Sequence, residues 1–212
     1  LSMSFKLFYQ RRTVMMMADD ALYIYAASSK GAVLVEVVPW DADGFIDNVA
    51  RILAKDCKSN PVLILNDMVE QHYRKERVLK RGVSLMDRSA FLDRKLHVAY
   101  PSYPVKAALK LSEKIKEKDK AKQADNYLFA AVPDSQQFNS TIKAAKKSLA
   151  SIASFCLLPV ESTDMVKALS EKCNRKKAPR NSWTIFIGQH KHEGLRQIVV
   201  KDGDLALTRM TP

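Results

Sequence analysis

A strand–turn–strand pattern occurs twice in this chain of 212 residues, once near each end, and it restricts the fold more than any other feature. In residues 22–39, two apolar segments, LYIYAA and AVLVEVVP, flank the short turn SSKG. Residues 183–212 repeat the pattern and extend it to three segments, WTIFIG, LRQIVV and LALTRM, with KDGD as the last turn. Asp-Gly between alternating apolar runs is a strong hairpin signal, because both turn residues take positive φ angles. The sequence therefore predicts two antiparallel meanders, each at the start of an α/β unit.

The segments between the two meanders alternate between helical and extended patterns. Helices are predicted where apolar residues recur every three or four positions, in residues 45–57, 87–98, 105–118 and 135–152, and in a further helix capped by Ser162 or Thr163. Strands are predicted in residues 62–65, 127–132 and 155–160, and residues 5–10 and 13–17 are expected to form a short hairpin. The helix over residues 135–152 has the most regular apolar stripe of these.

The order of these elements predicts three ranges in the chain. Residues 1–125 are expected to form a first unit with a helical insertion, and residues 126–182 a strand–helix–strand–helix segment. Residues 183–212 are expected to begin a second unit, whose strands lack the helices that would cover them. We therefore expect an α/β protein in which the second unit is abbreviated or truncated.

Composition indicates a globular chain, with 47% hydrophobic and 27% charged residues. No apolar run approaches the ~20 residues of a membrane-spanning helix. The three cysteines are far apart and form no Cys-x-x-Cys motif, so we expect reduced thiols in a cytosolic setting rather than a disulfide or zinc framework.

The chain is basic, with a formal net charge of +12. Part of the excess lies in three clusters, residues 74–81, 106–122 and 172–180. Such clusters suit acidic proteins, anionic lipid or nucleic acid, but the interpretation that we favour is solvated helix faces and loops. Aromatic residues are not interleaved with the lysines as a platform for single-stranded nucleic acid requires, so nucleic acid is not the expected partner.

Three stretches resemble the actin-like assembly proteins of type IV pilus and type II secretion systems, namely PilM-like proteins and the cytoplasmic domain of GspL-like subunits. They are YIYAASSKGAVLVEV, NYLFAAVPDSQQFNSTIKAAKKSLASIASFCLLPVES, and the last meander, and together they span about half of the chain. The resemblance lies in their order and spacing. It implies an actin-like fold, which is a duplicated ribonuclease-H-like fold. It also implies a location in the bacterial cytoplasm, at the face of the inner membrane.

An actin-like ATPase needs carboxylates for Mg²⁺ and glycines that let backbone N–H groups approach the phosphates. The resemblance places the first phosphate turn at Ser28, Ser29 and Lys30, with Ile24 where the family has an aspartate and Ala26 where it has a glycine. Those three residues can touch a phosphate, but a plain hairpin turn is the favoured interpretation. In the second turn Gly188 is kept, while the strand before it carries no acid. We therefore expect vestigial turns and no ATP hydrolysis, with ATP binding left open.

His190 and His192, followed by Glu193, raise the alternative of a metal site. The sequence offers no third ligand for it, so no metal site is predicted. No Walker A loop, Gly-x-Ser-x-Gly motif or nucleophile–histidine pair is present either.

The resemblance implies a non-catalytic adaptor that links platform subunits of the inner membrane to the assembly ATPase, and a homodimer is left open. The alternative is a nucleotide-binding actin-like ATPase. A weaker alternative, suggested by net charge alone, is a basic nucleic-acid-binding module.

Overall fold

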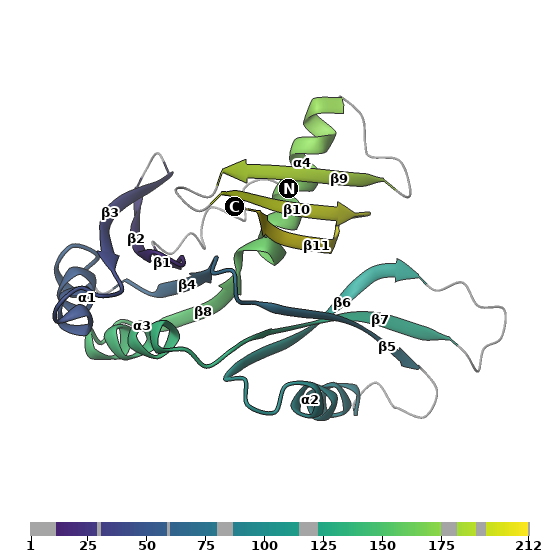
Figure 1. Cartoon of the computed structure of the whole chain (residues 1–212), viewed down its shortest axis with the longest axis horizontal. Coiled ribbons are helices and arrows are strands. Elements are labelled where there is room, and N and C mark those ends of the chain that lie inside the picture. The colour runs from purple at the N-terminus through teal and green to yellow at the C-terminus, as the bar shows by residue number, and fades with distance from the viewer. Residues whose placement is uncertain are drawn as a thin grey trace, which may run out of the picture. The chain divides into compact units, whose positions relative to one another are not determined.

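The computed structural model describes residues 12–28, 31–58, 60–79, 87–114, 123–174, 182–189 and 194–211. These residues fall into two compact units that are interleaved along the chain (Figure 1). The first unit takes its residues from the part of the chain before Val69 and from Ser135–Leu158. The second takes them from Val69–Asp134 and Pro159–Pro212. The three ranges proposed from the sequence stay a prediction.

The first unit contains one mixed sheet with the strand order β3-β2-β1-β4-β8. Its strands are β1 (Thr13–Met17), β2 (Ala21–Ser28), β3 (Gly31–Pro39), β4 (Val62–Asn66) and β8 (Ile152–Leu157). The first three strands form an antiparallel meander, and β4 and β8 extend the sheet as parallel strands. The meander predicted from residues 22–39 is therefore confirmed.

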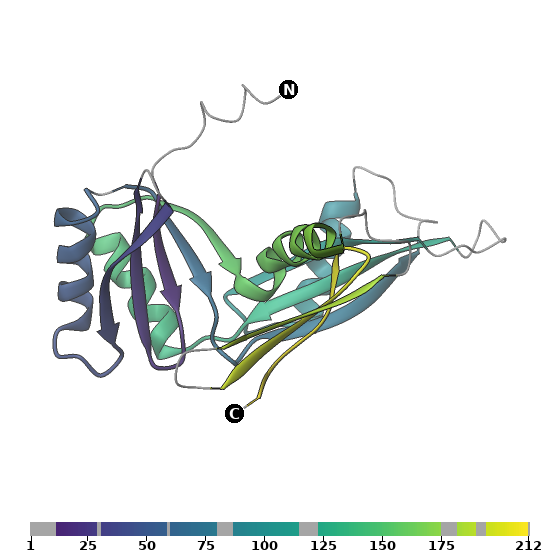
Figure 2. The same ribbon diagram turned by 90° about the horizontal axis from the view of Figure 1, so that it is seen from above.

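Two helices, α1 (Phe45–Lys55) and α3 (Gln136–Lys147), lie side by side against this sheet (Figure 2). The spacing of Phe45, Val49, Ile52 and Leu53 gives α1 one apolar face, and all four residues are buried. In the sheet, Met15 is paired with Ile24 on one side and Ile64 on the other, and none of the three is exposed to solvent. The core of the first unit is thus built by residues that alternate along β1, β2 and β4.

The second unit contains two three-stranded antiparallel sheets, with the orders β5-β7-β6 and β11-β10-β9. Their strands are β5 (His72–Leu79), β6 (Val105–Lys114), β7 (Ala124–Val132), β9 (Trp183–Gln189), β10 (Leu195–Lys201) and β11 (Asp204–Thr211). Its helices are α2 (Arg88–Ala99) and α4 (Leu158–Asn174). At the β10–β11 turn, Asp202 and Gly203 have φ angles of 53° and 93°, so the predicted Asp-Gly hairpin and the second meander are confirmed.

Strand β7 is the centre of the second unit, and every one of its residues is buried. On one face of its sheet, Tyr127 and Phe129 pack in a cluster with Leu96 of α2. On the other face, Leu128 packs in a cluster with Val166 of α4 and Ile198 of β10. A strand that is covered on both faces needs a continuous apolar run, which explains the sequence YLFAAV.

The helix predicted for residues 105–118 is wrong, because residues 105–114 form strand β6. The lysine, alanine and leucine residues of this segment favour a helix intrinsically, but β6 pairs with β7 from Val105 to Lys110 and again at Lys114. This backbone pairing, with Ala108 against the α2 cluster and Leu111 against the α4 cluster, outweighs propensity. Strand β5 was not predicted at all, since its sequence HYRKERVL is mostly polar.

Two boundaries near β8 also differ from the prediction. Helix α3 ends at Lys147 rather than at Ile152, because Leu149 has a left-handed φ of 59° that terminates the helix. The strand predicted for residues 155–160 lies instead at Ile152–Leu157, and α4 begins at Leu158, before the predicted caps. Pro159 is the second residue of α4, where a missing N–H costs no helical hydrogen bond. Residues 5–10 of the predicted N-terminal hairpin lie outside the described residues.

Candidate functional site

The first predicted phosphate turn lies between β2 and β3 in the first unit. Ser28 is paired with Gly31, and its hydroxyl donates a hydrogen bond to the Gly31 carbonyl oxygen at 2.8 Å. Gly31 has a φ of +126°, which favours glycine at this position. Ser29 and Lys30 lie outside the described residues. The Ser28 hydroxyl thus closes the hairpin, as a plain turn requires.

Ile24 and Ala26 occupy the positions where the resemblance places an aspartate and a glycine. The Ile24 side chain is 0% exposed and belongs to the core of the first unit. An unpaired carboxylate at this depth would be strongly disfavoured, since burial penalises the charged form. Strand β2 therefore offers no magnesium ligand at this position.

Gly188, the glycine of the second predicted phosphate turn, lies within β9 in the second unit and pairs with Arg196 of β10. A Cβ atom at this position would lie 2.9 Å from Cε1 of the Phe186 ring. Close packing of the backbone against this ring is a structural reason for the glycine. His190, His192 and Glu193, the residues of the metal hypothesis, lie outside the described residues.

The structure shows a buried polar pair that the sequence analysis missed, Asn66 and Asp67, at the carboxyl end of β4. They are 0% and 3% exposed, and the Asp67 N–H donates to the carbonyl oxygen of Met17 at 2.8 Å. Asp19 and Asp20 follow the neighbouring strand β1, and Asp20 accepts a hydrogen bond from the Tyr23 hydroxyl. The signal in the sequence was an Asn-Asp pair directly after a buried strand, at the sheet edge where α/β proteins bind ligands. Among the described residues, no group of three or more His, Cys, Asp and Glu side chains could hold a metal ion.

A groove of about 650 Å³ lies between α2 and β5 in the second unit, and we call it the α2–β5 groove. Its apolar lining includes Phe91 and Val98 of α2 and Phe129 of β7. Its charged residues are Arg74 and Glu76 of β5 and Arg94 and Lys95 of α2. The volume lies in the range of ligand pockets, about 300 to 1,000 Å³.

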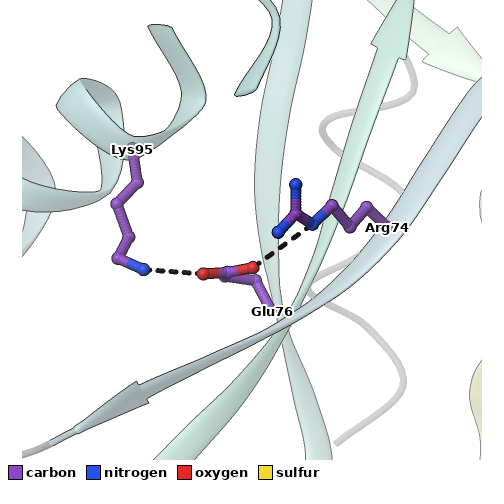
Figure 3. Close-up of polar contacts among 3 residues, drawn as sticks. All are labelled: Arg74, Glu76 and Lys95. Carbon is purple, nitrogen blue, oxygen red and sulfur yellow. Dashed lines mark hydrogen bonds and ion pairs between the residues drawn. The ribbon is translucent and has the colours of Figure 1, made fainter. Parts of the chain in front are cut away.

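Glu76 is the only acid among the described residues that line this groove, and it forms ion pairs with two cations (Figure 3). Its Oε1 accepts from Lys95 Nζ at 2.6 Å, and its Oε2 lies 3.4 Å from Arg74 Nε. The Lys95 ammonium also lies 5.9 Å from the centre of the Phe91 ring. Nearby, burial raises the pKa of the Tyr100 hydroxyl, and the charge of Arg74 partly opposes this shift.

Comparison with known proteins finds a likeness only at the level of structure. No family model and no curated protein sequence matches the chain. A chain of the PilM–PilN type IV pilus biogenesis complex superposes with a TM-score of 0.63 at 11% identity. This match covers 94% of the present chain and 60% of that chain, so the present chain spans less than two thirds of its length.

Two further structures are similar. One is the cytoplasmic domain of EpsL, an inner-membrane component of the type II secretion system of Vibrio cholerae, with a TM-score of 0.51 at 7% identity. That match covers 95% of the present chain and 71% of the EpsL chain. The other, at a TM-score of 0.46 and 11% identity, is a Bacteroides thetaiotaomicron protein with actin-like ATPase fold and unknown function. This match covers 98% of the present chain and 72% of the Bacteroides chain.

The fold is actin-like. The predicted fold class is therefore confirmed, and the proteins that share the fold are those to which the three sequence stretches pointed. Among the described residues, no helix is both long enough and apolar enough to cross a membrane.

Proposed function

We propose that this chain is a non-catalytic scaffold in the inner-membrane assembly platform of a type IV pilus or type II secretion system. In this role it lies at the cytoplasmic face of a bacterial inner membrane and links platform subunits to the assembly ATPase. The observation that carries the proposal is the structural likeness to a chain of the PilM–PilN complex, which extends over 94% of this chain. The EpsL likeness supports the same class of machine.

The proposal of a non-catalytic protein is supported by the apolar residue at the first phosphate turn. Ile24 is fully buried where the family resemblance requires a magnesium-binding aspartate, and the Ser28 hydroxyl is used within its own hairpin. At this position of β2 the chain therefore lacks the magnesium ligand that the resemblance requires. We expect a phosphate-release assay with Mg-ATP to show no turnover, and isothermal calorimetry with Mg-ATP measures whether the nucleotide binds without being hydrolysed.

A nucleotide-binding protein is the second candidate, and the buried Asp67 at the carboxyl end of β4 favours it. It is tested by the same two assays on the full chain and on the Asp67→Asn and Asp43→Asn variants. ATP turnover that is lost in Asp67→Asn and kept in Asp43→Asn would replace the scaffold proposal with this candidate. The Asp43→Asn variant is the matched control, because it makes the same change at an exposed position of the same unit.

The scaffold proposal itself is tested by affinity capture of the tagged full chain from cross-linked native membranes. We expect recovery of platform subunits and of the assembly ATPase, and size-exclusion chromatography shows whether the chain also forms a homodimer. Recovery of nucleic acid without any pilus or secretion component would contradict the proposal and favour the nucleic-acid alternative.

A further inference from the structure

The α2–β5 groove carries an excess of positive charge that no part of the proposed scaffold function has yet used. The described residues that line it include three cations, Arg74, Arg94 and Lys95, and one carboxylate, that of Glu76. Such a groove attracts acidic groups and disfavours basic ones. Among the described residues, the structure gives Arg94 no ion-pair partner.

The residues of α2 that line the groove recur at helical spacing. They are Phe91, Arg94, Lys95 and Val98, and Phe91 also packs against the core cluster that contains Leu96. Val98 is 84% exposed although it is aliphatic. An exposed valine in a groove that is also lined by Phe91, Arg94 and Lys95 provides a contact for an apolar side chain that is flanked by acids.

Glu76 occupies the position that an incoming carboxylate would take. Its two oxygens face Lys95 and Arg74, and its side chain is 20% exposed. Because these ion pairs are partly open to water, each contributes little to stability and is easily exchanged for a pair with another carboxylate.

The geometry fits carboxylates better than phosphates. Phosphate sites use backbone N–H groups at helix N-termini and glycine-rich turns. The α2 residues of the groove run from Phe91 to Ala99, and no glycine is among the described residues that line it. The long side chains of Arg74, Arg94 and Lys95 are the charged donors among the described lining residues, and they suit the carboxylates of a flexible chain.

We propose that the α2–β5 groove binds an acidic peptide segment of a partner protein. An apolar side chain of the segment lies against Phe91 and Val98, and carboxylates on either side of it pair with Arg94 and Lys95. This inference rests on the proposed scaffold function, in which a platform protein supplies the segment.

The test uses fluorescence anisotropy with the full chain and the labelled peptide GDELFEDG. One control peptide, GNQLFQNG, has the same shape without the charges, and the other, GDESSEDG, keeps the charges without the apolar pair. We expect each control to bind about tenfold more weakly, since both the charge and the apolar contact are needed.

Groove variants locate the binding. Arg94→Glu and Val98→Asp are each expected to weaken binding about tenfold, and both residues are exposed, so the fold is kept. Glu76→Gln is expected to strengthen binding a few fold, because the competing carboxylate is removed. Lys172→Glu is the matched charge reversal on α4, which packs against the opposite face of the β5-β7-β6 sheet, and it should change affinity less than twofold. Circular dichroism of each variant checks the fold.

Equal losses in Arg94→Glu and Lys172→Glu would overturn the inference, as would weaker binding in Glu76→Gln. Displacement of the peptide by pyrophosphate or by a single-stranded oligonucleotide at lower concentration than by unlabelled peptide would also overturn it. If the peptide does not bind while membrane capture still recovers platform subunits, the groove inference fails and the scaffold function stands. If the peptide binds through Arg94 while capture recovers none, the groove inference stands and the scaffold function fails.

Discussion

Truncation of Phe129 to alanine is expected to destabilise the second unit strongly. Phe129 lies on β7, is 1% exposed, and packs in a cluster with Val78, Leu96 and Tyr127. Loss of a fully buried phenylalanine costs about 3 to 5 kcal/mol, because its transfer energy is lost and a cavity remains. With an m value of ~2 kcal/mol/M, the urea midpoint should fall by about 2 M.

The loss of stability is measured by urea unfolding of the full chain. Unfolding is monitored by circular dichroism and, in a Trp40→Phe background, by the fluorescence of Trp183. Trp183 belongs to the same unit as Phe129, so its signal reports the unfolding of that unit. Phe129→Leu keeps most of the volume and should cost about 1 kcal/mol. Val98→Ala, at an exposed position of the same groove, should stay within about 0.5 kcal/mol of the parent. A loss below about 1 kcal/mol in Phe129→Ala would show that the core closes around the gap, and would refute this reasoning.

Three further outcomes follow from local contacts. Ser135→Ala should cost about 1 kcal/mol in the same unfolding assay, because the Ser135 hydroxyl oxygen accepts the N–H of the third residue of α3 at 3.1 Å; an unchanged midpoint would contradict this. Burial raises the pKa of Tyr25, Tyr100 and Cys57 above their ordinary values of 10.0 and 9.0, so the folded state holds these protons more tightly. Below pH 9 these groups should therefore leave the free energy of unfolding unchanged, and above pH 9 this free energy should fall as the pH rises. A free energy of unfolding that stays constant above pH 9 would argue against the burial of these groups. Alkylation with iodoacetamide at neutral pH should modify the exposed Cys173 well before the buried Cys57. Peptide mass spectrometry gives the order of modification, and earlier modification of Cys57 would contradict this prediction.

The sequence was sufficient to predict the helices and turns that are determined by local residues, without contacts to distant segments. The β10–β11 hairpin follows from Asp202 and Gly203, since this dipeptide adopts the positive φ angles of the turn without help from other segments. Helix α1 follows from its apolar face, because this periodicity is local.

The elements that depend on distant partners could not be predicted in the same way. Strands β5 and β6 are polar and lysine-rich segments, and only pairing with β7 between them makes them strands. The same limit applies to the candidate sites. The α2–β5 groove joins residues of β5, α2 and β7, and the Asn66–Asp67 pair gains its position from the neighbouring strand β1.

The interleaving of the two units has a consequence for the order in which the chain can fold as it leaves the ribosome. The first unit needs β8, which pairs with β4 across more than eighty intervening residues, so its sheet cannot be completed until Leu157 has emerged. Strands β5, β6 and β7 with α2 are contiguous within Val69–Asp134, and their pairings are available earlier during synthesis. Until β8 is synthesised, β4 is an unpaired edge strand of the N-terminal sheet and can pair with a wrong strand. Translation speed through residues 69–158 is therefore expected to influence how much of the chain reaches the native state.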